Sequence, residues 1–340
     1  MNSDHGDPIL SLDEIRSLAR DILVDKGFSE AQASAIAHNV ACAERDGCES
    51  HGLFRIPFYV SALQNADVNP TAEPSVSVGD SSVIHVDAGH GFCPLALEKG
   101  LPPLIERTRA RGIGALAIHR AYNIAALWPE VERLAEADLV AFAFTASIAY
   151  VAPAGGRTPV FGTNPMAFAF PRRNAPPLVF DQASSVAARG EILLHRRDGR
   201  ELPDGWAIDA SGRPTTDPDA ALEGAQLPFG GYKGSSIALM VELLAGPLIG
   251  ELSSREATAH DRAGTHAPFG GEFLMAIDPA HTALPGTEAS HLDRAERIFA
   301  SILEQEGTRL PSARRHASRK RHLAEGVRVS RTTLESIAAG

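Results

Sequence analysis

The sequence predicts an α/β protein in which helices from both chain ends pack together beside a central sheet. Three observations lead to this fold class. Apolar residues recur at helical spacing over the first 65 residues, β-rich runs alternate with helical ones after Pro70, and helical patterns return from His291. Strands interleaved with helices are typical of a sheet covered by helices. We therefore expect a helical domain from residues 1–75 and 285–340, and an α/β domain over residues 76–284.

Helix-capping patterns mark the helical start. Ser11 followed by Glu14 has the spacing of a capping box, and Gly27 can end the helix that follows through a left-handed cap. Ser29 opens a second helix in the same way. A third helix is expected over residues 51–63, where apolar residues again recur three and four positions apart.

The central part combines predicted strands and helices without an internal repeat. The stretch 198–226 is rich in Gly, Pro and Asp, so we expect a long surface excursion there. Strands are predicted at residues 82–87, 114–118, 139–145, 166–170, 178–181 and 273–277, and helices at 94–111, 125–137 and 233–248.

Composition and charge argue against several classes of protein. A net charge of −10 counts against a nucleic-acid partner or an anionic membrane. Three cysteines form neither a disulfide framework nor a paired metal motif, and the 13 histidines show no ligand spacing, so no metal site is expected. The start lacks the features of a signal peptide, and no run reaches the about 18 apolar residues of a membrane span. We expect a cytoplasmic protein.

The stretch most typical of a catalytic site runs from Asp46 to Arg55. His51 and Arg55 are four residues apart, so on a helix they share one face. This pair suits a small 2-keto, 2-hydroxy or 2-imino acid, because an imidazole can transfer a proton while a guanidinium binds a carboxylate with two hydrogen bonds. Ser50 beside them can relay or orient that proton. From the spacing alone, a surface histidine and a solvated ion pair remain an alternative.

A standard dinucleotide-binding signature is missing. Gly112-Ile-Gly114-Ala-Leu-Ala117 matches GxGxxA by letters, but its second glycine opens a β-rich run. The true motif leaves a strand and enters a helix, so that the pyrophosphate meets a helix N-terminus. We expect a tight turn into a strand here, and any nicotinamide cofactor must bind without a standard Rossmann half.

Two loops and the C-terminal tail are weaker candidates for binding. Phe161-Gly-Thr-Asn-Pro165 is a strand-ending turn, which turn chemistry explains as well as a site does. A glycine-flanked Lys233 precedes an apolar helix, where backbone amides, the helix dipole and the lysine can converge on a phosphate. The basic residues between 309 and 331 allow three interpretations: a solvated helix face, a cofactor-phosphate site or nucleic-acid contact.

In register along nearly the whole chain, these motifs resemble the malate/L-lactate dehydrogenase family that lacks a Rossmann fold. The resemblance implies a homodimer with an unusual NAD(P)-binding α/β domain, whose sheet is mixed and helix-covered, and a helical domain from both chain ends. Within the family, residues 125–132 and 227–234 are most similar to the branch of Δ1-piperideine-2-carboxylate/Δ1-pyrroline-2-carboxylate reductases. The resemblance rests on the Asp46…Ser50-His51-Gly52…Arg55-Ile-Pro57…Tyr59 run, Phe161–Pro165, Gly231-Tyr-Lys-Gly234 and Arg309-Leu-Pro311.

The branch implies NADPH-dependent reduction of cyclic 2-imino acids, from Δ1-pyrroline-2-carboxylate to L-proline and from Δ1-piperideine-2-carboxylate to L-pipecolate. The partner is then a small cyclic imino acid, with neither nucleic acid nor membrane, and NADH is the alternative cofactor. The alternative function is a malate/lactate- or ureidoglycolate-type 2-hydroxy acid dehydrogenase on the same fold. Its machinery would be nearly the same, because a carbonyl and an imine both need a hydride, a proton and a carboxylate clamp.

The resemblance also implies roles for single residues. His51 matches the family's proton-transfer histidine, and Ser50 and Glu191 match its relay partners, although this branch has aspartate at the position of Glu191. Arg55 matches the carboxylate-binding arginine, and Thr163 matches a substrate contact. The implied cofactor contacts are Asn123, Ile124, Ala125, Ala126, Leu127, Asp181, Gln182, Ala183, Arg189, Gly190, Tyr232, Lys233, Arg309, Arg314 and Arg315.

Two departures from the branch lie in cofactor segments. The branch commonly carries a His-His pair where this chain has Tyr122-Asn123, and it often reads Leu-Pro-Gly where this chain has Leu310-Pro311-Ser312. They bear on the affinity for the cofactor and on the preference for NADPH over NADH. They leave the proposed proton donor unchanged.

Overall fold

A seven-stranded mixed sheet forms the centre of the computed structural model, which describes residues 6–65, 67–287 and 291–339. The strand order is β2-β3-β4-β11-β5-β6-β7, and every neighbouring pair is antiparallel except β3 and β4. The predicted mixed sheet is therefore confirmed. The strands are β2 (Ser75–Val78), β3 (Val83–Asp87), β4 (Ile113–Tyr122), β5 (Val140–Thr145), β6 (Met166–Phe170), β7 (Leu178–Gln182) and β11 (Phe269–Ile277).

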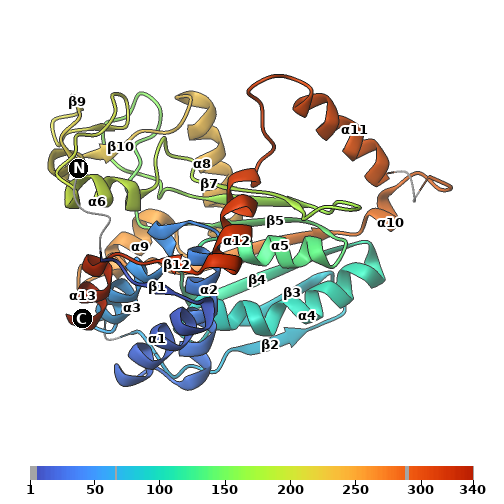
Figure 1. Cartoon of the computed structure of the whole chain (residues 1–340), viewed down its shortest axis with the longest axis horizontal. Coiled ribbons are helices and arrows are strands. Elements are labelled where there is room, and N and C mark those ends of the chain that lie inside the picture. Colours follow the sequence, from blue (N-terminus) through green and yellow to red (C-terminus); the bar gives the residue numbers. More distant parts are fainter. Residues whose placement is uncertain (1–5, 66, 288–290, 340) are drawn as a thin grey trace.

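Helices cover both faces of this sheet. In β4, Leu116 and Ile118 pack with α4 (Cys93–Arg111) and α5 (Trp128–Glu136), whereas Ala117 between them packs with α8 (Tyr232–Ala245) on the opposite face. Such alternation follows from the two-residue period of a strand. Figure 1 shows α4 and α5 on one side of the strands and α8 on the other.

The two chain ends pack together, as expected. The short strand β1 (Ile9–Leu10) pairs with β12 (Val327–Arg328), close to the last helix, α13 (Arg331–Ala339). Apolar residues of α1 (Leu12–Asp25) and α2 (Glu30–Arg45) share one buried core with residues of β12 and α13. The domain boundaries at residues 75 and 285 stay a prediction.

The predicted starts of the first two helices are confirmed. Ser11 and Glu14 form a capping box at the start of α1, and the Ser29 side chain accepts a hydrogen bond from the backbone at the start of α2. Gly112 adopts a left-handed conformation with φ 81° and leads directly into β4. The GxGxxA match is therefore a turn into a strand, as expected, because no helix follows it.

The surface excursion at 198–226 contains a small three-stranded sheet, and α11 (His291–Leu303) stands away from the rest of the molecule (Figure 1). Within the described residues no single helix has the length and apolar character of a membrane span; one pair bent by 66°, Tyr232–Ile249 with Ser254–His260, reaches both only together. The other elements are η1 (Glu49–His51), η2 (Leu53–Arg55), α3 (Ile56–Ala62), α6 (Arg189–Arg197), β8 (Ala207–Ile208), β9 (Pro214–Thr215), α7 (Pro218–Glu223), β10 (Ala225–Gln226), η3 (Pro247–Ile249), α9 (Ser254–His260), α10 (Pro279–Thr282) and α12 (Ala313–Glu325).

Candidate active site

A cavity of 850 Å³ brings together residues from distant parts of the chain. The predicted proton-transfer histidine His51, the predicted carboxylate-binding Arg55 and the predicted substrate contact Thr163 all line it. Four of the predicted cofactor contacts line the same cavity: Asn123, Ile124, Ala125 and Arg189.

The expected third helix over residues 51–63 is wrong in its first half. Two short 3-10 turns, η1 and η2, precede α3, so His51 and Arg55 do not lie on one face of an α-helix. The cause is a close contact with α2. A Cβ atom on Gly52 would lie 2.1 Å from the Glu44 carboxylate, and that carboxylate accepts the backbone N–H of Leu53 at 2.7 Å. The turn around Gly52 nevertheless directs His51 and Arg55 to the same cavity.

His51 lies in a desolvated environment with one polar neighbour. Its Nδ1 atom is 3.2 Å from the Ser50 hydroxyl, and its ring meets the Trp128 ring edge-on at 6.3 Å between centroids. Burial and, second, the nearby Arg55 cation lower the pKa of His51 to about 3. In the ligand-free protein His51 is therefore a neutral imidazole at physiological pH.

Arg55 presents a guanidinium without an acidic partner. Its Nε–H donates to the Ser50 carbonyl at 2.6 Å, and its guanidinium lies 5.2 Å from the centroid of the Phe58 ring. Burial lowers the pKa of Arg55, and within the described part of the chain no carboxylate forms an ion pair with it. Arg55 is half-buried in the cavity wall. A partly desolvated cation without an ion-pair partner favours an anionic ligand. The absence of a side chain at Gly190 leaves space for the Arg55 guanidinium, because a Cβ atom there would lie 3.0 Å from Arg55 Nη2.

The Phe161–Pro165 turn holds Thr163 at the cavity. Hydrogen bonds with buried polar groups fix the conformation of this turn. Asn164 adopts a positive φ of 38°, and its Nδ2 donates to Glu242 at 2.6 Å and to the Ala238 carbonyl at 3.0 Å. The Ser254 hydroxyl accepts the backbone N–H of Gly162 at 2.8 Å. The predicted turn is therefore also part of the site, since its hydrogen bonds leave the Thr163 side chain at the cavity wall.

Among the described residues, Glu191 is not hydrogen-bonded to those that the resemblance implies as its relay partners. It lies in the first turn of α6, next to Gly190, but it does not line the cavity, and none of the hydrogen bonds found among described residues joins it to Ser50 or His51. Its relay role stays a prediction.

The family can be assigned at this point. The sequence model of the malate/L-lactate dehydrogenase family matches residues 10–338. The chain belongs to the malate/L-lactate dehydrogenase family. A solved family structure, the Δ1-piperideine-2-carboxylate reductase from Pseudomonas syringae pv. tomato, matches with a TM-score of 0.92 and 40% identity, over 98% of this chain and 99% of that one.

Two curated relatives show the range of names within the family. The Δ1-pyrroline-2-carboxylate/Δ1-piperideine-2-carboxylate reductase of Pseudomonas aeruginosa is 50% identical over 94% of this chain and 95% of its own length. The (2R)-3-sulfolactate dehydrogenase (NADP(+)) of Chromohalobacter salexigens is 41% identical over 97% of both chains.

Several cofactor contacts implied by the family do not line the cavity. Ala126 and Leu127 are buried in the core between the sheet and α5. The Asp181 carboxylate accepts the backbone N–H groups of Leu127 and Trp128 at 2.9 and 3.1 Å, so it caps α5. Burial raises the pKa of Asp181 to about 6. Gln182 is exposed, and neither Ala183 nor Gly190 lines the cavity, although Gly190 follows the lining residue Arg189. Tyr232 and Lys233 are exposed at the start of α8.

The basic residues between 309 and 331 include exposed arginines and arginines that bind other parts of the protein. Arg309 and Arg314 are exposed, whereas Arg315 lies over the Trp128 ring at 5.1 Å and donates to the Val179 carbonyl. Arg319 binds the buried carboxylates of Asp46 and Glu132, so the interpretation of the tail as a solvated helix face is wrong for this residue.

The residues present fit a phosphate-bearing dinucleotide. Nη1 of Arg315 is buried and has no hydrogen-bond partner among the described residues. Arg189 lies 4.2 Å above the Tyr150 ring and donates to the Leu222 carbonyl, again without a carboxylate partner in the described part of the chain. Unused donors of this kind suit anionic oxygens. The described residues contain no group of three or more acidic, histidine or cysteine side chains placed to hold a metal ion.

The two departures from the branch, at Tyr122-Asn123 and at Ser312, lie in different surroundings. Tyr122 is buried in an aromatic cluster, 4.9 Å from Phe269, and does not line the cavity. Asn123 does line it, and donates to the buried Glu272. Ser312 adopts a φ of 63°, the left-handed region that favours the glycine common in the branch, and begins α12.

Sequence analysis missed other residues of the cavity wall. Phe54 and Phe58 lie next to Arg55, while Tyr150 and His266 come from loops without any motif. The aromatic spacing of Phe54 and Phe58 was a detectable signal, whereas Tyr150 and His266 are brought in by tertiary packing alone.

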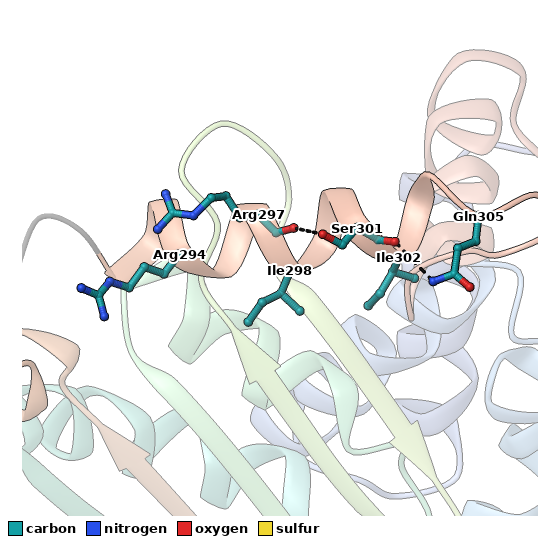
Figure 2. A pocket seen from close by; sticks show the side chains of 6 residues that line it. All are labelled: Arg294, Arg297, Ile298, Ser301, Ile302 and Gln305. Atoms are coloured by element: carbon teal, nitrogen blue, oxygen red, sulfur yellow. Dashed lines mark hydrogen bonds between the residues drawn. The ribbon is translucent and has the colours of Figure 1, made fainter.

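A second, open cavity of 490 Å³ lies under α11. Figure 2 shows Ile298 and Ile302 pointing from α11 toward the strands below it. Arg172, which follows β6, forms a two-bonded ion pair with Glu296 of α11. This cavity contains none of the residues predicted for the site.

Proposed function

We propose that this chain reduces cyclic 2-imino acids with NADPH, converting Δ1-pyrroline-2-carboxylate to L-proline and Δ1-piperideine-2-carboxylate to L-pipecolate. One observation carries the proposal: a half-buried guanidinium without an acidic partner among the described residues, Arg55, lines one cavity with a half-buried imidazole, His51. The names of the reductases at 50% and 40% identity support the substrate class. The chain is accordingly an oxidoreductase that works with NAD(P)H.

Arg55 binds the substrate carboxylate and thereby fixes the ring in the cavity. A carboxylate accepts two parallel N–H bonds from a guanidinium, which restricts the orientation of the adjacent C=N bond. The Thr163 hydroxyl supplies a second polar contact to the same ligand. A bound nicotinamide would supply the hydride for C2, and the residues of this chain hold the substrate for that transfer.

His51 supplies the proton that the ring nitrogen gains for each hydride accepted at C2. In the ligand-free protein, burial and the Arg55 cation together keep the imidazole neutral. The substrate carboxylate neutralises Arg55 and so removes the second of the two causes of the low His51 pKa, while burial, the larger cause, remains. His51 therefore gains proton affinity when substrate binds, and the proton enters the site with the substrate. The imidazolium then donates its proton to nitrogen and returns to the neutral form, while Ser50 orients the ring through Nδ1. Glu191 completes the relay in this proposal.

The preference for NADPH over NADH is also part of the proposal. Arg189, which lines the cavity, and Arg315, which lies outside its lining but has an unused buried donor, would hold phosphate oxygens. Asn123, Ile124 and Ala125 would line the nicotinamide side. The sulfolactate relative, whose name specifies NADP(+), supports the same choice.

We further propose a cytoplasmic homodimer with the two domains predicted above. Three free cysteines suit a reducing compartment. The described part of α11 buries no residue, and Ile298 is 61% exposed, so this helix has an apolar side that a second copy could cover. Sedimentation equilibrium of the wild type and of Ile298→Glu tests this: a dimer in both would refute a role for α11 in the contact.

The substrate class is tested by following NADPH absorbance with four compounds. Δ1-pyrroline-2-carboxylate and Δ1-piperideine-2-carboxylate are compared with pyruvate and oxaloacetate, and each assay is repeated with NADH. Fast oxidation with the cyclic imines alone supports the proposal. Turnover only with the open keto acids would replace it by the 2-hydroxy acid dehydrogenase alternative, and faster turnover with NADH would overturn the cofactor preference.

A further inference from the structure

A buried acidic cluster lies directly behind the Asn123 wall of the cavity, and the proposed reaction does not use it. Glu272 of β11 is 1% exposed and Glu130 of α5 is 4% exposed. Cys93, at the start of α4, donates to Glu272 Oε2 at 3.0 Å, and Asn123 Nδ2 donates to the same oxygen at 2.5 Å. The strand β11, the helix α4 and the cavity wall therefore meet at one carboxylate oxygen.

The strongest influences on this cluster are negative or neutral groups. Glu130 and Glu272 face each other, and Cys93, Asp181 and Asn123 are the other groups that act on them; none is a cation. Burial, followed by repulsion from Glu272, raises the pKa of Glu130 well above its ordinary value. Burial raises the pKa of Glu272 to about 7, against the hydrogen bonds from Cys93 and Glu130.

The hydrogen bonding around Glu272 is incomplete unless one carboxyl carries a proton. Oε1 of Glu272 is buried and has no donor among the described residues when both glutamates are ionised. Glu130 is the neighbouring carboxyl group. Two carboxylates side by side in a buried site cannot both be ionised, and a single proton between them supplies the missing donor.

We propose that Glu130 and Glu272 share one proton and that this acid pair is a positioning group for Asn123. The Asn123 amide is held at both ends, because Nδ2 donates to Glu272 and Oδ1 accepts the Ala125 backbone N–H at 3.1 Å. The shared proton keeps the pair at a single negative charge, which the buried site tolerates, and leaves Oε2 free to accept from Asn123. The amide thereby keeps one orientation in the wall of the cavity. This inference rests on the proposed function, since it places Asn123 beside the cofactor.

A double-mutant cycle on NADPH affinity tests the positioning. Glu272→Leu leaves the Asn123 donor without its acceptor and should raise the NADPH Kd, measured by fluorescence titration, about tenfold. Asn123→Ala should have an effect of similar size. If Glu272 acts through Asn123, the double variant binds no worse than either single variant. Effects that multiply in the double variant would overturn the proposal.

Two further variants separate positioning from general loosening of the core. Glu272→Gln keeps an oxygen that accepts from Asn123, so it should restore nearly wild-type NADPH affinity. Cys93→Ala removes the other donor to Oε2 and does not touch the cavity, so it should leave the NADPH Kd unchanged. A loss of affinity in Cys93→Ala as large as in Glu272→Leu, or in Glu272→Gln as large as in Glu272→Leu, would contradict a role through Asn123.

The shared proton has a readout that needs no cofactor. Infrared spectra of the wild type at neutral pH should show a carbonyl band of a protonated carboxyl that disappears in both Glu130→Gln and Glu272→Gln. A spectrum without that band would overturn the inference even if NADPH binds. Failure of the wild type to bind NADPH would instead refute the proposed function and leave the infrared result to decide on the shared proton.

Discussion

Removing the Arg319 guanidinium should destabilise the protein strongly, although sequence analysis assigned this residue to a basic tail. Its Nη2 donates to Asp46 at 2.6 Å and to Glu132 at 2.7 Å, and both carboxylates are almost fully buried. The contact ties α12 to α2 and α5. The same Asp46 carboxylate accepts the indole N–H of Trp128, whose ring meets His51, so the ion pair also supports the wall of the active site.

The expected loss for Arg319→Met follows from what the variant leaves behind. Breaking a buried ion pair by removing one partner costs about 3–5 kcal/mol, because the other charge stays buried. Asp46 keeps the hydrogen bond from Arg45 at 2.7 Å, so the lower end, about 3 kcal/mol, applies. With a denaturant slope of about 3 kcal/mol per molar, the urea midpoint should fall by about 1 M.

The dependence on pH has a definite sign. Burial raises the pKa of Asp46, but hydrogen bonds from Arg319 and Arg45 outweigh it, so this pKa lies below its ordinary value. The Glu132 pKa is likewise lowered, since the nearby His316 imidazole and the hydrogen bonds from Arg319 outweigh burial. Carboxylates with depressed pKa values stabilise the fold above their unfolded pKa and lose this contribution as pH falls through the folded value. The difference between wild type and variant should therefore be full at neutral pH and shrink below about pH 4.

The assay is urea unfolding followed by circular dichroism at one fixed protein concentration, because subunit association would shift the midpoint. The matched control is Lys320→Met, an exposed cation on the same helix, which should change the free energy of unfolding by less than about 0.5 kcal/mol. A loss below about 1 kcal/mol in Arg319→Met would refute the assignment of Arg319 as a structural ion-pair partner.

Three predictions concern the cavity itself. His51→Ala should lower kcat by about 10²- to 10⁴-fold with a modest change in cofactor affinity, because it removes the proton donor; near-normal turnover would remove His51 from the mechanism. Gly190→Ala places a Cβ atom 3.0 Å from Arg55 Nη2 and should raise the substrate KM several-fold with unchanged thermal stability; an unchanged KM would show that Arg55 tolerates displacement. Thr163→Val removes a hydroxyl of the cavity wall and should raise KM about 3- to 10-fold, whereas a wild-type KM would exclude Thr163 as a ligand.

The parts of the fold that local signals specify were predictable from the sequence. The capping box at Ser11 lies inside four consecutive residues, and it correctly marks the start of α1. The strand β11 was predicted only from residue 273, but it begins at Phe269, because pairing with β4 continues across Gly270 in spite of the missing apolar alternation. The edge strand β2, Ser75–Val78, was missed although Ser and Val alternate along it, a pattern typical of a strand; all four of its residues are exposed.

The candidate site was predictable for residues whose own side-chain chemistry indicates their role. His51, Arg55 and Thr163 were named in advance and line one cavity, although the helix expected to carry the first two does not form. What could not be predicted depends on contacts between distant segments. Glu130 and Glu272 lie 142 residues apart in sequence (272 − 130) and become an acid pair only when α5 packs against the sheet.

The central claim is that Arg55 binds the carboxylate of a cyclic imine in this cavity, and it is tested by changing the protein and the ligand together. The kcat/KM for NADPH-dependent reduction is measured with Δ1-pyrroline-2-carboxylate and with Δ1-pyrroline, which lacks the carboxylate, for the wild type and for Arg55→Ala. The wild type should prefer the carboxylate compound, and Arg55→Ala should reduce that preference about 10- to 100-fold, mainly through KM. A preference of the same size in both proteins would contradict the account.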